Sequence, residues 1–183
     1  MKESETGGRQ DKVARRGSAD STTIHSLIAD LASKDGRVRE RARKSLVAER
    51  GRAVSALIGA LADQREQVRW EAAKALGCIG DPSSGHGLVR TLEDEDPGVR
   101  WLAAEALVAI GLEALVPLLQ ALIERADSLW LREGAHHVVH NLARKNTKEF
   151  LLPLLAALED IDPSVKVPLA VRVALDGLTK AKG

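Results

Sequence analysis

The sequence predicts an all-α protein whose fold is a right-handed α-solenoid, a stack of about five helical hairpins. The first observation behind this prediction is an internal repeat: an aliphatic residue followed by a cation recurs about every 31 residues, a period typical of solenoids. The second is that apolar residues follow each recurrence at helical spacing. We call the recurring pairs anchors; they are Val38-Arg39, Val68-Arg69, Val99-Arg100, Leu131-Arg132 and Val165-Lys166.

Each anchor lies on the predicted second helix of its hairpin. An Ala or Leu comes four residues after the aliphatic member and a Leu or Val eight residues after it, so the three side chains share one helix face. These residues are Ala42 and Leu46, Ala72 and Leu76, Ala103 and Leu107, Ala135 and Val139, and Leu169 and Val173. An earlier apolar set predicts the first helices, which contain Leu27, Leu57, Leu88, Leu118 and Leu154.

Capping residues mark the predicted helix ends. A side-chain oxygen three residues before an anchor can accept the unpaired backbone N–H groups of the first turn. Asp35, Asp96, Ser128 and Asp162 hold this position, and Pro97 and Pro163 follow two of them at the first helical residue, where proline costs nothing. Gly80 and Gly111 are expected to end second helices in a left-handed conformation.

The predicted organisation is one repeat domain preceded by a tail. Residues 1–20 are rich in Gly, Ser and mixed charges, which predicts disorder. Residues 21–183 are expected to form a single domain, with repeats at about 22–51, 52–81, 82–111, 112–145 and 146–180.

Two segments carry a resemblance to a known family. VRWEAAKALGCIGDP at 68–82 and DPGVRWLAAEALVAIG at 96–111 resemble short HEAT-like repeats of the phycobilisome-lyase type, and the resemblance extends over residues 22–180. It implies HEAT-like hairpins. The resemblance does not specify one function, because the family includes bilin lyase subunits, a di-iron hydroxylase, DNA glycosylase relatives and plain protein-binding scaffolds.

Composition excludes several classes of function. The net charge is +1, and cations alternate with acids along the predicted surface, which argues against nucleic-acid binding. No apolar run reaches the roughly 18 residues of a membrane span, and residues 1–20 lack the apolar core of a secretory signal, so we predict a cytoplasmic protein. The single cysteine, Cys78, excludes an internal disulfide and is interpreted as a small packing residue. No cofactor is predicted.

The register indicates which residues face a partner. In solenoids of this kind, second helices line the concave face, and the residues two, three and six after the anchor are not used by the core. Trp70 and Trp101 hold position two of adjacent repeats. Tryptophan is enriched in interface hot spots, so these rings are the leading candidates for recognition. The alternative is that each ring only shields the groove by covering a neighbouring Lys or Arg stem. The expected polar rim comprises Glu71, Lys74, Glu105 and His137.

Histidines on the fourth repeat offer a weaker candidate. His136 and His140 share a helix face, as a two-point metal site requires, but they occupy packing positions. A structural seam beside the small residues Ala170 and Ala174 is the preferred interpretation, and no metal is predicted. The hydroxylase relatives carry His-Glu pairs just after the anchor, where this sequence has Trp70-Glu71 and Trp101-Leu102. The protein is therefore predicted not to be an enzyme.

The functional prediction is a protein-interaction scaffold that binds a protein or peptide on its concave face. A lyase-like or maturation subunit, which would hold a modified polypeptide such as one bearing a chromophore, remains the alternative. The anchor arginines are expected to form a ladder of Arg–Asp contacts between successive loops. In the last repeat Val167 and Val171 are expected on the groove face, and Pro168 is expected to start or kink the helix. This incompletely capped end predicts self-association.

Overall fold

The computed structural model describes residues 23–146 and 149–182, so the predicted tail at 1–20 lies outside the described residues. A first helix covers 23–30. The following helices are α2 (Gly36–Glu49), α3 (Gly51–Ala60), α4 (Glu66–Ile79), α5 (Gly85–Thr91), α6 (Pro97–Ile110), α7 (Leu115–Glu124), α8 (Leu129–Asn146), α9 (Leu152–Leu158) and α10 (Pro163–Lys182). Short 3-10 turns precede α5, α7 and α9, and the described residues contain no strand.

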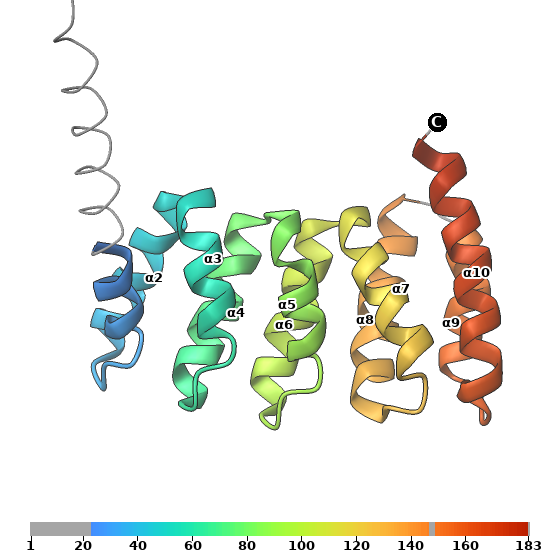
Figure 1. The fold of residues 1–183 in the computed structure, drawn as a ribbon, viewed down its shortest axis with the longest axis horizontal. Helices are drawn as coiled ribbons and strands as arrows, with labels where there is room; N and C mark the ends of the chain where they lie inside the picture. The colour runs from blue at the N-terminus through green and yellow to red at the C-terminus, as the bar shows by residue number, and fades with distance from the viewer. Residues whose placement is uncertain (1–22, 147–148, 183) are drawn as a thin grey trace, which may run out of the picture.

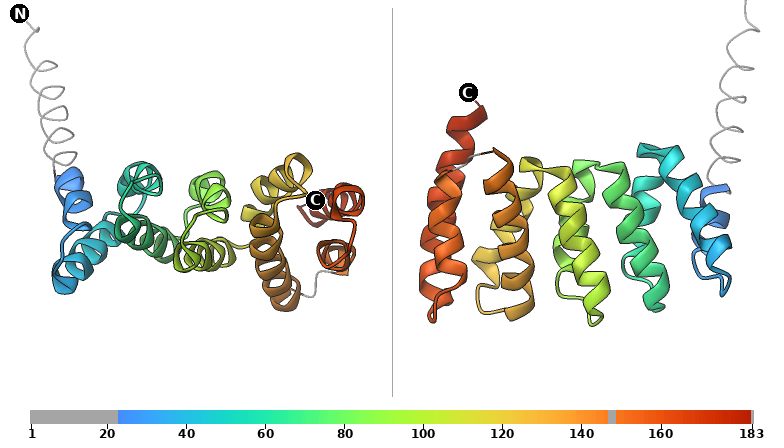
Figure 2. Two further views of the ribbon diagram at one scale, coloured as in Figure 1. Left: turned by 90° about the horizontal axis from the view of Figure 1, so that it is seen from below. Right: turned by 180° about the vertical axis from the view of Figure 1, so that it is seen from behind.

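The helices form the predicted α-solenoid (Figure 1). The first helices of successive hairpins, including α3, α5 and α7, lie in one layer, and α2, α4, α6 and α8 lie in a second layer behind them. Contacts between neighbouring repeats run mainly through this second layer, from α2 to α4, from α4 to α6 and from α6 to α8. Both further views show the same side-by-side stacking (Figure 2).

Local chemistry sets the helix ends where the sequence predicted them. Asp35 accepts a hydrogen bond from the backbone N–H of Arg37 at 2.8 Å, and Asp96 accepts one from that of Val99 at 2.8 Å. Gly80 ends α4 with φ of 68°, and Gly111 ends α6 with φ of 90°. Side chains other than glycine rarely adopt these angles, so both glycine predictions are confirmed.

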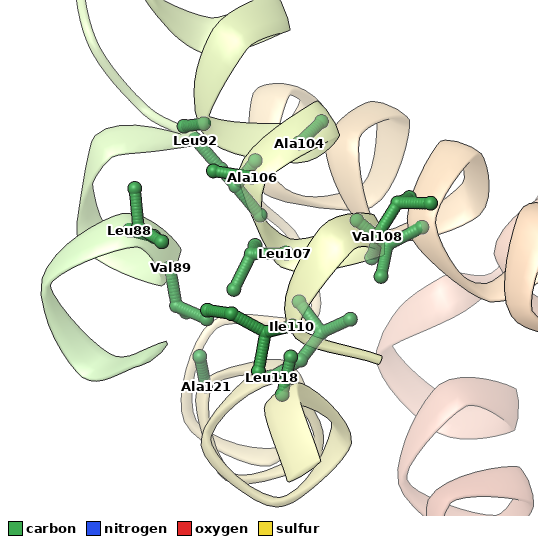
Figure 3. Packing of buried hydrophobic residues seen from close by; sticks show 14 of the residues in the cluster. Leu88, Val89, Leu92, Ala104, Ala106, Leu107, Val108, Ile110, Leu118 and Ala121 are labelled. Atoms are coloured by element: carbon green, nitrogen blue, oxygen red, sulfur yellow. The ribbon is translucent and has the colours of Figure 1, made fainter. Parts of the chain in front are cut away.

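The core is a continuous aliphatic seam between the two layers. The anchor residues Val68, Val99 and Leu131 are fully buried, as are the residues four and eight positions after them. Figure 3 shows how this works in the third repeat, where Leu88 and Val89 of α5 and Leu107 of α6 pack toward Leu118 of α7. Burying each such side chain contributes roughly 1.5–3 kcal/mol, so stability is distributed along the stack.

The anchor arginines bond mainly to their own loops. Nη1 of Arg39, Arg69 and Arg100 each donates to two backbone carbonyls five and six residues earlier, at 2.8 to 3.2 Å. Among the described residues, Arg69 alone of the anchor cations also reaches an aspartate in the next loop, Asp94. The predicted ladder of Arg–Asp contacts between loops is therefore wrong except at this step.

The terminal helix pair is reversed. α10 packs mainly against α9 and α7, and α8 packs against α9. Helix α10 thus stands in the layer of first helices, and α9 continues the layer of second helices (Figure 1). The reversal follows from a second apolar stripe on α10, two residues out of register with the anchor pattern, and this stripe is the buried one: Val167, Val171, Ala174 and Leu178.

This reversal overturns two expectations for the last repeat. Val167 and Val171 are fully buried instead of lining a groove. The anchor stripe is exposed instead, with Val165 at 58%, Leu169 at 60% and Val173 at 47%. Helix α10 also begins at Pro163 and continues through Pro168, so the helix does not start at the internal proline.

No single helix in the described part of the chain is long and apolar enough to cross a membrane. The helices Pro97–Ile110 and Leu112–Glu124 reach the length and apolar composition of a membrane span only when they are counted together, and they are bent by 118° relative to each other.

Candidate functional site

A groove between α6 and α8 gathers exposed aromatic side chains. It has a volume of about 360 Å³ and is lined by residues that include Trp101 of α6 and Trp130 of α8. Trp101 is 57% exposed and Trp130 is 43% exposed, which is unusual for side chains of this size. Arg100, Glu133 and His137 supply polar groups along the same groove.

Trp101 is supported from one side by a histidine. The ring centroids of Trp101 and His137 are 4.6 Å apart, with the planes tilted by 58°. His137 Nε2 in turn donates to Glu105 Oε1 at 2.6 Å, which links α8 to α6. The predicted position-six residues Glu105 and His137 therefore lie beside Trp101, and their contact orients the ring without covering it.

Trp130 is a groove residue that the register analysis missed. It lies one residue before its anchor, a position not considered as groove-facing. The guanidinium carbon of Arg100 lies 4.6 Å from the centroid of its ring, a cation–π contact that holds Trp130 against α6. A signal in the sequence could have found it. The equivalent positions in the two preceding repeats hold Gln67 and Gly98, so a large aromatic residue at this position stands out.

Trp70 has a different environment from Trp101, although both hold position two. A side chain at Gly98 would begin 3.6 Å from Trp70 Cδ1 and Nε1, so the Trp70 ring lies over this glycine at the start of α6. Lys74 Nζ sits 4.6 Å from the ring centroid. Trp70 is half-buried. Trp101 instead shares its groove with Trp130, which holds the position in its repeat that Gly98 holds in the preceding one. The Trp70 ring thus has the shielding arrangement, while the Trp101 ring stays open.

Glu71 lies at the contact between two repeats. Its carboxylate is buried and accepts from Arg43 Nη1 at 2.6 Å, with Arg39 Nε at 3.4 Å. These contacts join α2 to α4, and a buried carboxylate needs such partners to offset the loss of hydration. Glu71 therefore joins two repeats, and it also lines a hollow between α2 and α4 together with Trp70 and Lys74.

The histidine cluster forms a seam with a different helix from the one expected. His136 and His140 stack with centroids 5.9 Å apart, and His136 Nε2 donates to Glu159 Oε1 at 2.8 Å. Glu159 follows α9, so the reversed terminal pair replaces Ala170 and Ala174 as the neighbours. The part of the chain that the structure describes contains no group of three or more residues able to hold a metal ion.

Cys78 is exposed near the end of α4, so the expectation of a small packing residue is wrong. Position ten of the register lies beyond the helix face that contacts α6, and small size alone does not bury a side chain there.

Comparison with known proteins places the groove within a recognised repeat. Residues 55–138, from α3 to α8, match the family model described as HEAT repeats. The match is to HEAT repeats in general, and the narrower phycobilisome-lyase type stays a prediction. No curated protein matches the chain.

Solved structures similar to this chain include three crystal structures of engineered proteins from a structural genomics consortium. One is 21% identical, with a TM-score of 0.44, over 88% of this chain and 49% of its own, so the chain spans about half of that protein's length. Another is 21% identical, with a TM-score of 0.47, over 97% of this chain and 95% of its own. The third is 20% identical, with a TM-score of 0.42, over 88% of this chain and 81% of its own.

Proposed function

We propose that this protein is a non-catalytic scaffold that binds an extended segment of a partner protein in the groove between α6 and α8. The observation that carries the proposal is the pair of exposed indoles, Trp101 and Trp130, in one groove. Two large rings held in place by His137 and Arg100 offer apolar contact area at low entropic cost. Such preorganised aromatic residues dominate the binding energy of many interfaces.

The shape and hydrogen-bonding capacity of the groove favour an extended segment. A volume of about 360 Å³ accommodates a few side chains. Neither indole N–H donates a hydrogen bond to another described residue. An extended segment presents backbone carbonyls with no internal partner, and these can accept from both indoles while apolar side chains lie on the rings.

The buried carboxylates support the non-catalytic part of the proposal. Glu71 is engaged by Arg43, and Asp94 is engaged by Arg69 in a pair with two hydrogen bonds. Both carboxylates therefore form contacts that join neighbouring repeats. The sequence positions that hold His-Glu pairs in hydroxylase relatives contain Trp70-Glu71 and Trp101-Leu102 here.

The proposal is tested by selecting peptides from a displayed random library on the full chain. Dissociation constants of the enriched peptides are then measured for the wild type and for Trp101→Ala and Trp130→Ala. Each substitution is expected to weaken binding by about 30-fold or more, the size of a hot-spot loss. Trp70→Ala serves as the matched control and should change affinity by less than about threefold, because its ring is shielded.

The proposal fails if Trp101→Ala and Trp130→Ala retain wild-type affinity while their circular dichroism spectra match the wild type. The lyase-like alternative rests on the family resemblance alone. A visible absorption band that copurifies with the full chain and is lost in Trp101→Ala would favour that alternative over a plain scaffold.

A further inference from the structure

An exposed apolar stripe runs along α10, the helix at the end of the stack in Figure 2. Val165, Leu169 and Val173 follow one another at intervals of four residues and are 58%, 60% and 47% exposed. In the preceding three repeats the equivalent residues are buried. The reversal of the last helix pair turns this stripe outward, and among the described residues no side chain covers it.

Charged residues on α10 and just before it are arranged symmetrically about position 171, midway between Leu169 and Val173 of this stripe. Leu169 and Val173 lie two residues either side of position 171. Lys166 and Asp176 lie five residues either side of it, and Asp162 and Lys180 lie nine residues either side. Lys166, Asp176, Asp162 and Lys180 are all exposed. Each of these three pairs thus combines either two apolar residues or two opposite charges, whereas the position symmetric with Val165 holds Gly177.

A second copy of α10 satisfies this symmetry. If two α10 helices pack antiparallel about a twofold axis at position 171, Leu169 of one chain faces Val173 of the other. Lys166 then faces Asp176, and Asp162 faces Lys180, each twice. A twofold interface requires this kind of self-complementarity, in which residue i contacts j and j contacts i. A parallel arrangement would instead place like charges opposite one another.

We propose that the protein forms a twofold homodimer through antiparallel packing of the Val165–Leu169–Val173 stripe of α10. None of the stripe residues lines the groove between α6 and α8. A single 20-residue helix from each chain is a small interface, so dissociation constants in the micromolar range are expected.

Sedimentation equilibrium of the full chain tests this proposal over about 1 to 200 µM, a range that brackets micromolar dissociation constants. The wild type should shift from monomer to dimer across this range. Leu169→Asp should raise the dissociation constant by at least about tenfold, because it places a carboxylate against Val173 of the second copy. Leu169 is exposed in the monomer, so the thermal unfolding of this variant should match the wild type at low concentration.

A charge exchange tests the antiparallel register itself. Lys166→Glu should weaken the dimer by placing two carboxylates opposite each other, and adding Asp176→Lys should restore it to within about threefold of the wild type. Lys166 also pairs with Asp160 in its own chain at 2.6 Å. Asp176→Lys does not restore that pair, so a recovery of dimer affinity in the double variant reports on the contact between the two chains.

Trp101→Ala separates this proposal from the groove proposal, since it should leave the dimer unchanged while abolishing peptide binding. A monomer at every concentration overturns the proposal. So does a dimer that Leu169→Asp leaves intact, and so does a double charge variant that stays as weak as Lys166→Glu.

Discussion

The guanidinium of Arg69 holds the carboxylate of Asp94 with two hydrogen bonds, from Nε at 2.7 Å and from Nη2 at 2.9 Å. The two side chains are only 8% and 9% exposed. This pair joins the second repeat to the third, and the hydrogen bonds that Arg69 donates to Asp94 raise the pKa of Arg69 above its ordinary value. It is thus a buried connection between two repeats, to which Arg69 adds a second contact with the exposed Glu95 at 3.1 Å.

Removing Asp94 should destabilise the protein strongly. Asp94→Ala leaves the buried Arg69 guanidinium without its main acceptor, and we expect a loss of about 2–4 kcal/mol in the free energy of unfolding. Urea denaturation followed by circular dichroism measures it. The matched control is Arg65→Ala, which removes the more exposed pair with Asp63 inside a single loop. Equal losses for the two variants would show that burial does not set the strength of these pairs.

The stability contributed by Asp63 should depend on pH. The hydrogen bond from the Arg65 side chain lowers the pKa of Asp63 from 3.8 to about 2. A carboxylate whose pKa is lower in the folded state stabilises the fold above its unfolded pKa, and this contribution is lost as pH falls through the folded pKa. Asp63→Asn should therefore unfold more easily than the wild type at neutral pH.

The stability difference between Asp63→Asn and the wild type should narrow below about pH 4 and disappear only below about pH 2, where Asp63 is protonated in the folded state and both chains have an uncharged side chain at position 63. Urea midpoints measured across this pH range check the prediction. A difference that stays constant with pH would mean that the substitution acts through packing or through the loop backbone.

Two glycines should respond oppositely to the same substitution. A Cβ at Gly59 in α3 would meet nothing within 4 Å, so Gly59→Ala should stabilise the protein by about 0.5–1 kcal/mol through helix propensity. A Cβ at Gly177 in α10 would clash with the ring of Phe150. Gly177→Ala must displace this ring and should lower the melting temperature, despite the same gain in propensity.

Thermal unfolding of the two alanine variants provides the comparison. Similar stabilisation by both would show that Phe150 does not pack against α10 as described.

The register of α10 can be tested with one pair of valines. Val171 is fully buried, so Val171→Ala should cost about 1–3 kcal/mol, whereas the exposed Val173 should tolerate alanine with a change below about 0.5 kcal/mol in the monomer. Denaturation at low protein concentration keeps self-association out of the measurement. The anchor pattern predicts instead that Val173→Ala costs more than Val171→Ala. Observing that order would indicate that the last repeat packs as the preceding repeats do.

Much of the fold could be read from the chain because its signals are local. The repeat period, the caps at Asp35 and Asp96 and the positive φ at Gly80 and Gly111 depend on residues a few positions apart. The candidate groove was located in part, since Trp101, Glu105 and His137 do lie together. Trp130 was missed because its role depends on which side chain faces it across the α6–α8 boundary.

The sequence by itself determined that helices pair in units and that aliphatic faces stack, because periodicity and capping are properties of neighbouring residues. Only the tertiary structure decided between competing faces of one helix. Helix α10 carries two apolar stripes, and local periodicity fits either of them. The stripe through Val167 and Val171 is buried because α9 and α7 together enclose it, and this choice leaves Leu169 exposed to solvent. Burial against distant segments is a property of the assembled stack, so no local pattern encodes it.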